Sequence, residues 1–283
     1  MTATEGSPTI DPAWASQASA IARESGARLR EFFTAGVETE YKGSADLVTV
    51  ADRTVEALIR SRLGQAFPSH GIYGEEGTRD QLDSEYRWYV DPLDGTTNFA
   101  HGFPVFCVSI GLAYRNEVVA GVVYDPMREE LFTAERGLGA YLNQQRIHVS
   151  KHGSLSESLV ATGFPPFLRD HELNIDLYYT FTRLTHGVRR AGSAALDLCS
   201  VAAGRFEGFW ELKLNPWDKA AGSLMVTEGG GRVTDLAGGP FELLGEAIFA
   251  SNGLVHDQML GVFSKHDAQT LGERPKAAAP VSR

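Results

Sequence analysis

The sequence predicts a layered α/β sandwich, with a sheet rich in antiparallel strands in its first half and a mixed sheet in its second. Two patterns carry this prediction. Between Val105 and Val149, short β-rich runs are separated by turn residues such as Asn116-Glu117 and Asp125-Pro126, which is typical of an antiparallel meander. From about Leu159 onward, strand-like and helix-like segments alternate. A chain of 283 residues can bury the core that such layers require.

The elements follow one another with clear local signals. Asp11-Pro12 begins a helix whose apolar residues recur at helical spacing as far as Phe33. Thr49 and Asp52 mark the start of a second helix, which Pro68 stops. Short β-prone runs follow at 72–73 and 87–90. Further helices are expected at 170–185, 193–203, 216–228 and 254–265, with Gly204 and Gly229 as C-terminal stops.

Composition and charge limit the class of protein. A hydrophobic content of 43% and an aromatic content of 10% are ordinary for a globular protein. The formal net charge of −10 disfavours nucleic acid or an anionic membrane as the main partner. It does not disfavour a phosphate substrate, because bound divalent cations reverse the local sign of the charge.

The cysteines and the N-terminus predict a soluble cytoplasmic protein. Cys107 and Cys199 lie in apolar segments without C-x-x-C spacing, which is typical of reduced core residues. Residues 1–7 lack the basic and apolar regions of a signal peptide, and no apolar run reaches membrane-spanning length.

The most informative motif is Asp91-Pro92-Leu93-Asp94-Gly95-Thr96-Thr97-Asn98. It follows a β-prone run and leads into a hydroxyl-rich turn, so we expect its two acids where a strand ends and a helix begins. Backbone N–H groups are unpaired at such a point and can accept an anion. Carboxylates beside free N–H groups are what a metal-dependent phosphate enzyme needs.

Acids elsewhere in the chain complete the motif. Asp52 and Asp218 fall in the first turn of predicted helices, Glu75-Glu76 follows a short strand, and each of these has an ordinary structural explanation when taken alone. Together they supply the oxygen ligands that Mg²⁺ prefers, and a two-metal site needs several acids around a bridging carboxylate. The scattered histidines offer no competing H-E-x-x-H or C-x-x-C metal motif.

At these residues the chain resembles the inositol monophosphatase family of Mg²⁺-dependent, lithium-sensitive sugar phosphatases. The resemblance runs from about residue 10 to 265 and implies the α-β-α-β-α layers of that family. Its motifs are specific when they occur together. They are Asp91-Pro-Leu-Asp-Gly-Thr-Thr-Asn-Phe99, Trp217-Asp218-Lys-Ala-Ala-Gly222 with Glu228-Gly-Gly-Gly231, Lys42 with Asp46 to Asp52, and Gly74-Glu75-Glu76.

The resemblance implies a role for each matching residue and two or three Mg²⁺ ions. Glu75, Asp91 and the Leu93 carbonyl would hold the first Mg²⁺. Asp91, Asp94 and Asp218 would hold the second, and Glu75 would contribute through water to a third. Lys42 and Glu76 are minor candidates.

The remaining implied residues would serve the water and the substrate. Asp52 and Thr96 would form the pair that orients the attacking water, with Glu75 as a further catalytic residue. The Gly95 and Thr96 amides would face the phosphate. For the sugar or cyclitol hydroxyls the matching residues are Gly192, Ser193, Ala194, Glu211 and Asp218, although Ser193 also fits an N-cap and Glu211 a surface acid.

The resemblance also implies the organisation of the chain. We expect one catalytic domain over residues 1–265, with halves at about 9–150 and 151–265, and a disordered tail over 266–283. The expected substrate is a small phosphorylated cyclitol or sugar, with inositol 1-phosphate first, and the expected assembly is a homodimer.

The alternatives are a phosphatase of another class, a different phosphatase of the same family and a non-enzymatic module. The Asp-x-Asp-x-Thr motif of haloacid dehalogenase-type phosphatases fails, because Pro92 lies two residues before Asp94, and no P-loop motif occurs. Within the family, Thr97 stands where nucleotide bisphosphatases and histidinol-phosphate phosphatases usually carry lysine, which favours an inositol monophosphatase or a related fructose-1,6-bisphosphatase. A non-enzymatic binding or regulatory module would not need the metal ligands. Every ligand position is intact here, which argues against a purely structural role but not against a second function.

Overall fold

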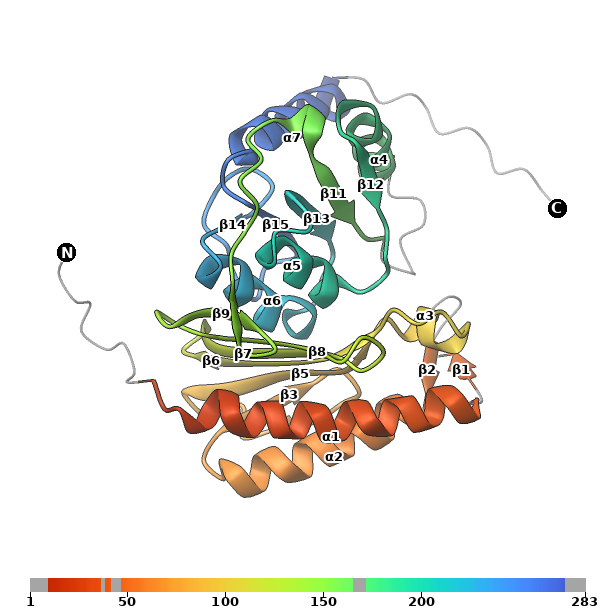
Figure 1. The fold of residues 1–283 in the computed structure, drawn as a ribbon, viewed down its shortest axis with the longest axis vertical. Coiled ribbons are helices and arrows are strands. Elements are labelled where there is room, and N and C mark those ends of the chain that lie inside the picture. Colours follow the sequence, from red (N-terminus) through yellow and green to blue (C-terminus); the bar gives the residue numbers. More distant parts are fainter. Residues whose placement is uncertain (1–9, 37–38, 42–46, 165–171, 273–283) are drawn as a thin grey trace.

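The computed structural model describes residues 10–36, 39–41, 47–164 and 172–272, which form five stacked layers (Figure 1). Two helices cover one face of a large sheet, two more lie between this sheet and a smaller one, and the last two cover the far face of the smaller sheet. The predicted α-β-α-β-α sandwich is therefore confirmed. From the first layer outward the helices are α1 (Ala13–Ala35) and α2 (Val50–Ala66), then α5 (Ala194–Ala202) and α6 (Pro216–Glu228), then α4 (Glu172–Leu184) and α7 (His256–Gly272).

The larger sheet has eight strands in the order β10-β9-β8-β7-β6-β5-β3-β4. Every neighbouring pair is antiparallel except β3 and β5, which are parallel. The meander predicted between residues 105 and 149 is confirmed as β6 to β10. The strands are β3 (Gly71–Gly74), β4 (Arg79–Asp80), β5 (Tyr86–Asp94), β6 (Cys107–Tyr114), β7 (Glu117–Asp125), β8 (Glu130–Glu135), β9 (Gly139–Leu142) and β10 (Gln145–Ile147).

The smaller sheet is mixed, as predicted, with the order β12-β11-β13-β15-β14. Strand β11 is parallel to both β12 and β13, whereas β15 is antiparallel to β13 and β14. Its strands are β11 (Leu159–Thr162), β12 (Gly187–Arg189), β13 (Gly208–Leu212), β14 (Arg232–Thr234) and β15 (Ala247–Ser251). Helix α3 (Thr96–Ala100) begins after Asp94, where the sequence predicts a strand-to-helix turn. Short elements not expected from the sequence are β1 (Thr39–Tyr41), β2 (Leu47–Thr49) and the 3₁₀ turn Leu155–Glu157.

Small residues bring α6 into close contact with the larger sheet. A Cβ at Gly111 on β6 would lie 2.7 Å from the Cβ of Ala220, and one at Gly121 on β7 would lie 2.9 Å from the Cα of Ala221. Such approaches are possible only without a side chain on the strand. They fix the start of α6, and with it Asp218, over the sheet.

Three apolar clusters fill the spaces between the layers. The first lies between α1, α2 and the larger sheet, the second surrounds α5 and α6, and the third packs α4 and α7 on the smaller sheet. Cys107 and Cys199 are both buried and free, so their prediction as core residues is confirmed. Among the described residues, no helix is long and apolar enough to span a membrane.

Most predicted helix boundaries agree with the structure to within a few residues, and one requires correction. Helix α7 continues to Gly272, beyond the predicted end at 265, because the sequence has no glycine or proline between Lys265 and Gly272. The predicted tail over 266–283 therefore begins too early. Residues 273–283 lie outside the described part of the chain.

His256 links the start of α7 to the smaller sheet. Its ring is buried and stacks on Phe249 with the centroids 4.1 Å apart. Nδ1 lies 2.8 Å from Ser251 Oγ and Nε2 lies 3.0 Å from Thr234 Oγ1. Burial, together with the charge of Arg232, lowers the pKa of His256 to about 4.

We expect the free energy of unfolding to fall as the pH is lowered from 6.5 to about 4, because in this window the unfolded chain binds a proton at His256 and the folded protein does not. The contribution is complete above the ordinary pKa and amounts to about 3 kcal/mol, at about 1.4 kcal/mol for each pH unit between 6.5 and about 4. Urea denaturation of the wild type and of His256→Gln at several pH values measures it. A difference between the two proteins that does not change with pH would contradict the prediction.

Candidate active site

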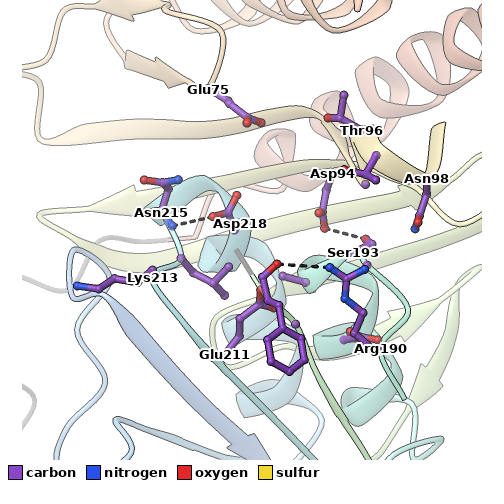
Figure 2. Close-up of a pocket in the computed structure, with 18 residues that line it drawn as sticks. Glu75, Asp94, Thr96, Asn98, Arg190, Ser193, Glu211, Lys213, Asn215 and Asp218 are labelled. Atoms are coloured by element: carbon purple, nitrogen blue, oxygen red, sulfur yellow. Dashed lines mark hydrogen bonds between the residues drawn. The ribbon is translucent and has the colours of Figure 1, made fainter. Parts of the chain in front are cut away.

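A pocket of about 200 Å³ opens where β5 leads into α3 (Figure 2). Side chains from both halves of the chain surround it. The first half contributes the turn between β3 and β4 and the end of β5, whereas the second contributes the ends of β11 and β13 and the starts of α5 and α6. Predicted residues that line the pocket are Glu75, Asp94, Gly95, Thr96, Gly192, Ser193, Ala194, Glu211 and Asp218.

A bulge in β5 carries Asp91 and Asp94. Asp91 pairs with Ser109 of β6 and Asp94 with Cys107, so the strand holds one extra residue at the bulge. Pro92 is tolerated there because a bulge does not need its missing N–H. Asp91 is 2% exposed, and its Oδ1 accepts a 2.9 Å hydrogen bond from the Leu93 N–H. Asp91 and Leu93 therefore lie behind the pocket wall.

Gly95 releases the chain from β5 into α3. Its φ of +102° is in the region that favours glycine, and a Cβ there would lie 2.8 Å from the Val105 carbonyl oxygen. The turn leaves Thr96 at the pocket wall, directly after Asp94 and Gly95.

Asp52 and Thr96 are in contact, as the resemblance implies. Asp52 Oδ2 accepts hydrogen bonds from the Thr49 N–H at 2.7 Å and the Thr49 hydroxyl at 2.6 Å, which caps α2. Asp52 Oδ1 lies 3.1 Å from Thr96 Oγ1, which is also 3.0 Å from the Leu93 carbonyl oxygen. Burial raises the pKa of Asp52, against the effect of the Thr49 hydrogen bonds.

Asp94 is anchored to the second half of the chain. Its Oδ2 accepts hydrogen bonds from the Ser193 hydroxyl at 2.7 Å and the Ala195 N–H at 2.8 Å, at the start of α5. Ser193 is also the N-cap of that helix, which confirms its structural interpretation, whereas its contact with a substrate hydroxyl stays a prediction. Burial raises the pKa of Asp94 to about 6 in spite of these bonds.

Asp218 lies at the start of α6. Its Oδ2 accepts a 2.6 Å hydrogen bond from the Asn215 N–H, which forms a capping box. Burial and the neighbouring Asp94 raise the pKa of Asp218, and burial with Glu75, Asp94 and Asp218 raises that of Asp91. The four carboxylates therefore repel one another across a small volume.

This donor set fits a hard divalent cation. Carboxylate and carbonyl oxygens are the ligands that Mg²⁺ accepts, and a positive charge would remove the repulsion. Among the described residues, no three histidine, cysteine or acidic side chains form a closed cluster around a point that could hold a metal. The acids instead surround the pocket from separate elements, which is the arrangement that uncompensated carboxylates favour.

Glu211 and Asp197 line the part of the pocket farther along α5 and β13. Glu211 is 7% exposed and lies against the backbone of Gly163, where a Cβ would come within 2.2 Å of its carboxylate oxygens. Asp197 is 2% exposed, and its Oδ2 has no hydrogen-bond partner. Burial raises the pKa of both acids. The basic residues at the rim already have partners: Arg190 contacts the Phe164 carbonyl, and Lys213 is ion-paired with Glu246.

Several polar residues in the pocket or next to it were not predicted from the sequence, among them Asp197, Glu56 and Asn98. Asp197 could have been found as an acid on an otherwise apolar helix face. Glu56, which is 4% exposed, follows Asp52 by one helical turn among apolar residues. Asn98 belongs to the Asp91–Asn98 motif, but no local signal in the sequence indicates its contacts across the pocket. Of the minor candidates, Glu76 does not line the pocket, and Lys42 lies outside the described residues.

The layers, the bulged strand and the capped helices define a sandwich protein whose acidic pocket suits an oxygen-ligated divalent cation. The chain belongs to the inositol monophosphatase family, whose sequence model matches residues 13–268. It is thus a member of a phosphatase family.

Relatives of this chain carry two kinds of name. An inositol-1-monophosphatase of Synechocystis is 44% identical over 89% of this chain and 89% of its own length. A Pseudomonas aeruginosa protein named Nus factor SuhB is also 44% identical, over 81% of this chain and 87% of its own. The structure of inositol monophosphatase from Anabaena (Nostoc) matches with a TM-score of 0.81 and 40% identity, covering 89% of this chain and 95% of that one.

Asn98 ties the two halves of the chain together at the pocket. Its Nδ2 donates to the Val105 carbonyl and to the Ala191 carbonyl, both at 2.8 Å. We expect Asn98→Asp to lower the free energy of unfolding by about 3 kcal/mol, because a carboxylate oxygen would then face two carbonyl oxygens.

Asn98→Ala should cost less than this, at about 1–2 kcal/mol, although it is the larger change in shape. Urea denaturation measures both variants, with the exposed Asn116→Asp as the control for the change of charge. An equal effect of Asn98→Asp and Asn116→Asp would contradict the prediction.

Proposed function

We propose that the protein is a Mg²⁺-dependent phosphomonoesterase that hydrolyses inositol 1-phosphate to myo-inositol and phosphate. One observation carries this proposal: Glu75, Asp94 and Asp218 line one pocket together with Thr96, whose hydroxyl contacts the buried Asp52. Family membership and the relatives named inositol-1-monophosphatase support it.

The metal ligands are proposed as follows. Glu75, Asp91 and the Leu93 carbonyl would hold a first Mg²⁺, Asp91, Asp94 and Asp218 would hold a second, and Glu75 would contribute through water to a third. When bound, these cations supply positive charge that stabilises the phosphate oxygens and the departing alkoxide. The hydrogen bonds from the Leu93, Ala195 and Asn215 N–H groups orient the three aspartates for this task.

Thr96 and Asp52 orient the attacking water. Thr96 has one proton to donate and two candidate acceptors, Asp52 Oδ1 and the Leu93 carbonyl oxygen. When the Thr96 hydroxyl donates to Asp52 Oδ1, its lone pairs can accept a hydrogen bond from the water. Asp52 then accepts the proton that the water loses through Thr96.

The rest of the pocket holds the substrate. The Gly95 and Thr96 amides face the phosphate, and Gly192, Ser193, Ala194 and Glu211 contact the cyclitol hydroxyls. Water is the nucleophile, so no phosphoenzyme forms. A cytoplasmic homodimer formed by a single catalytic domain is part of the same proposal and rests on family membership.

Asp218→Asn tests the metal ligands. We expect it to lower turnover by more than about 100-fold while the protein stays folded, because an amide is a much weaker ligand for a hard cation and can still accept the capping hydrogen bond. Asp257→Asn, which changes an exposed acid in the first turn of α7, is the matched control and should leave turnover unchanged. Phosphate release and circular dichroism measure the two effects, and near-normal turnover in Asp218→Asn would refute the ligand assignment.

Thr96→Ala and Asp52→Asn test the water-orienting pair. Each should lower kcat by about 10²–10⁴-fold. The double variant should be no slower than the slower single variant, because both changes disable the same unit. Steady-state kinetics at saturating Mg²⁺ measure this, and additive losses would show that the two residues act separately.

A substrate panel separates the alternatives. Phosphate release is measured from inositol 1-phosphate, fructose 1,6-bisphosphate, histidinol phosphate and adenosine 3′,5′-bisphosphate, with and without Mg²⁺ and Li⁺. Preference for another ester would assign the chain to a different phosphatase of the family. A lack of Mg²⁺-dependent release from all four would favour a binding or regulatory module, a role in keeping with the relatives named Nus factor SuhB.

A further inference from the structure

The turn that carries Glu75, between β3 and β4, is held by the side chain of Glu56 from α2 and by that of Arg79 from β4. Two of its backbone bonds are internal to the sheet: Gly74 N–H donates to the Thr78 carbonyl at 3.0 Å and Glu75 N–H to the Val90 carbonyl at 3.1 Å. Gly77, with φ of +113° and open space around it, lets the chain reverse. These bonds alone leave other backbone N–H and carbonyl groups of the turn without a partner in the sheet. Neighbouring side chains form hydrogen bonds with them.

Glu56 of α2 holds the turn from one side. Its Oε2 accepts a 2.6 Å hydrogen bond from the Glu76 N–H, and its Oε1 accepts a 2.9 Å hydrogen bond from the Thr78 N–H. The carboxylate lies so close to Gly74 that a Cβ there would be 2.4 Å from Oε2. The Glu76 N–H follows Glu75 directly, and the Thr78 N–H lies on the other side of Gly77. Glu56 therefore fixes the backbone from which the Glu75 side chain projects.

Arg79 holds the same turn from the other side. Its guanidinium donates to the carbonyls of Gly74 and Thr78, the latter at 2.7 Å. It lies over the Tyr73 ring at 3.9 Å from the centroid and over the Trp217 ring at 5.6 Å. Trp217 directly precedes Asp218, so Arg79 connects the Glu75 turn to the start of α6.

Helix α2 contacts two parts of the site, the Thr96 hydroxyl and the turn that carries Glu75. Asp52 and Glu56 are one helical turn apart and therefore share a face. Asp52 contacts Thr96, whereas Glu56 binds the turn of Glu75. The helix thus fixes the water-orienting hydroxyl relative to the first acid.

We propose that Glu56 is a positioning residue that sets the affinity of the first Mg²⁺ site by holding the Glu75 turn in its ligating position. The inference rests on the proposed function, which makes Glu75 a metal ligand. Residues that orient a ligand in this way contribute about 10–100-fold to metal affinity in other metalloproteins. Glu56 does not touch the metal or the substrate, so its effect falls on metal binding and not on the chemical step.

A carboxylate is required at position 56 for a definite reason. Both N–H groups need an acceptor, and the ionised carboxylate is an acceptor at both oxygens. Glutamine has the same shape, but its amide nitrogen would face one of the two N–H groups as a second donor. Glu56→Gln therefore disturbs the turn with almost no change in volume.

Titration calorimetry with Mg²⁺ alone tests the proposal without an activity readout. We expect Glu56→Gln to raise the dissociation constant for Mg²⁺ by about 10–100-fold relative to the wild type. Glu228→Gln is the matched control, because Glu228 is also a helix glutamate that accepts hydrogen bonds from two turn N–H groups, those of Gly137 at 2.7 Å and Gly139 at 2.8 Å, away from the pocket. It should bind Mg²⁺ as the wild type does.

One further variant and an activity readout keep the test decisive. Arg79→Met removes the exposed clamp on the other side of the turn and should raise the dissociation constant in the same direction, even if Glu56→Gln does not fold. In the activity assay, the Mg²⁺ concentration for half-maximal rate should rise by the factor found by calorimetry, whereas kcat at saturating Mg²⁺ should stay close to that of the wild type. A general loss of structure would lower kcat and would not be corrected by Mg²⁺.

The failure of this inference can be distinguished from failure of the proposed function. Wild-type affinity for Mg²⁺ in both Glu56→Gln and Arg79→Met would overturn the positioning role and leave the metal ligands in place. Wild-type affinity in Glu75→Gln would overturn the assignment of Glu75 as a ligand, and the role of Glu56 with it.

Discussion

The pocket depends on holding several carboxylates close together in spite of their mutual repulsion. Burial and neighbouring acids raise the pKa of Asp91 and Asp218, so the ionised forms are costly in the absence of a cation. The fold meets this cost with backbone dipoles. One oxygen of each aspartate accepts a hydrogen bond from a backbone N–H. Asp91 accepts from Leu93, Asp94 from Ala195, and Asp218 from Asn215. In Asp94 and Asp218 the bonds from Ser193, Ala195 and Asn215 all fall on Oδ2.

The same hydrogen bonds make the acids part of the fold. Asp52 and Asp218 both occupy the third position of a capping box, so each stabilises the start of a helix while its second oxygen faces other groups. An acid in the first turn of a helix is favoured by the macrodipole whatever its function, and the sequence alone could not choose between that explanation and a catalytic one. In the structure the two explanations are compatible, because the capping hydrogen bond fixes the side-chain rotamer of each acid and with it the direction of its second oxygen.

The elements that could be predicted from the sequence are those with local signals. The meander, the helix starts at Thr49 and Asn215, and the strand-to-helix turn at Gly95 depend on residues a few positions apart. The acids of the site were found because their types and order matched a family pattern. Glu56 was missed because its partners, the Glu76 and Thr78 N–H groups, lie 20 and 22 residues away and exist only once the larger sheet has formed. The ties of Asn98 to Ala191 and of Asp94 to Ser193 cross still longer stretches of chain.

The division of the pocket between the two halves explains why the sequence is more informative about phosphate than about the alcohol. The proposed cation ligands come mainly from the bulge of β5 and the turn after β3, where the bulge, the glycine and the caps leave little freedom of sequence. The surface for the organic half comes from β11, β13 and α5, where Gly163 makes space for Glu211 and the buried Asp197 lies nearby. Recognition of a hydroxyl there needs only one or two acceptors at a suitable distance, and many side chains can supply them. A change of substrate within this fold would therefore require few substitutions in the second half and none among the proposed metal-binding acids, so those acids cannot identify the alcohol.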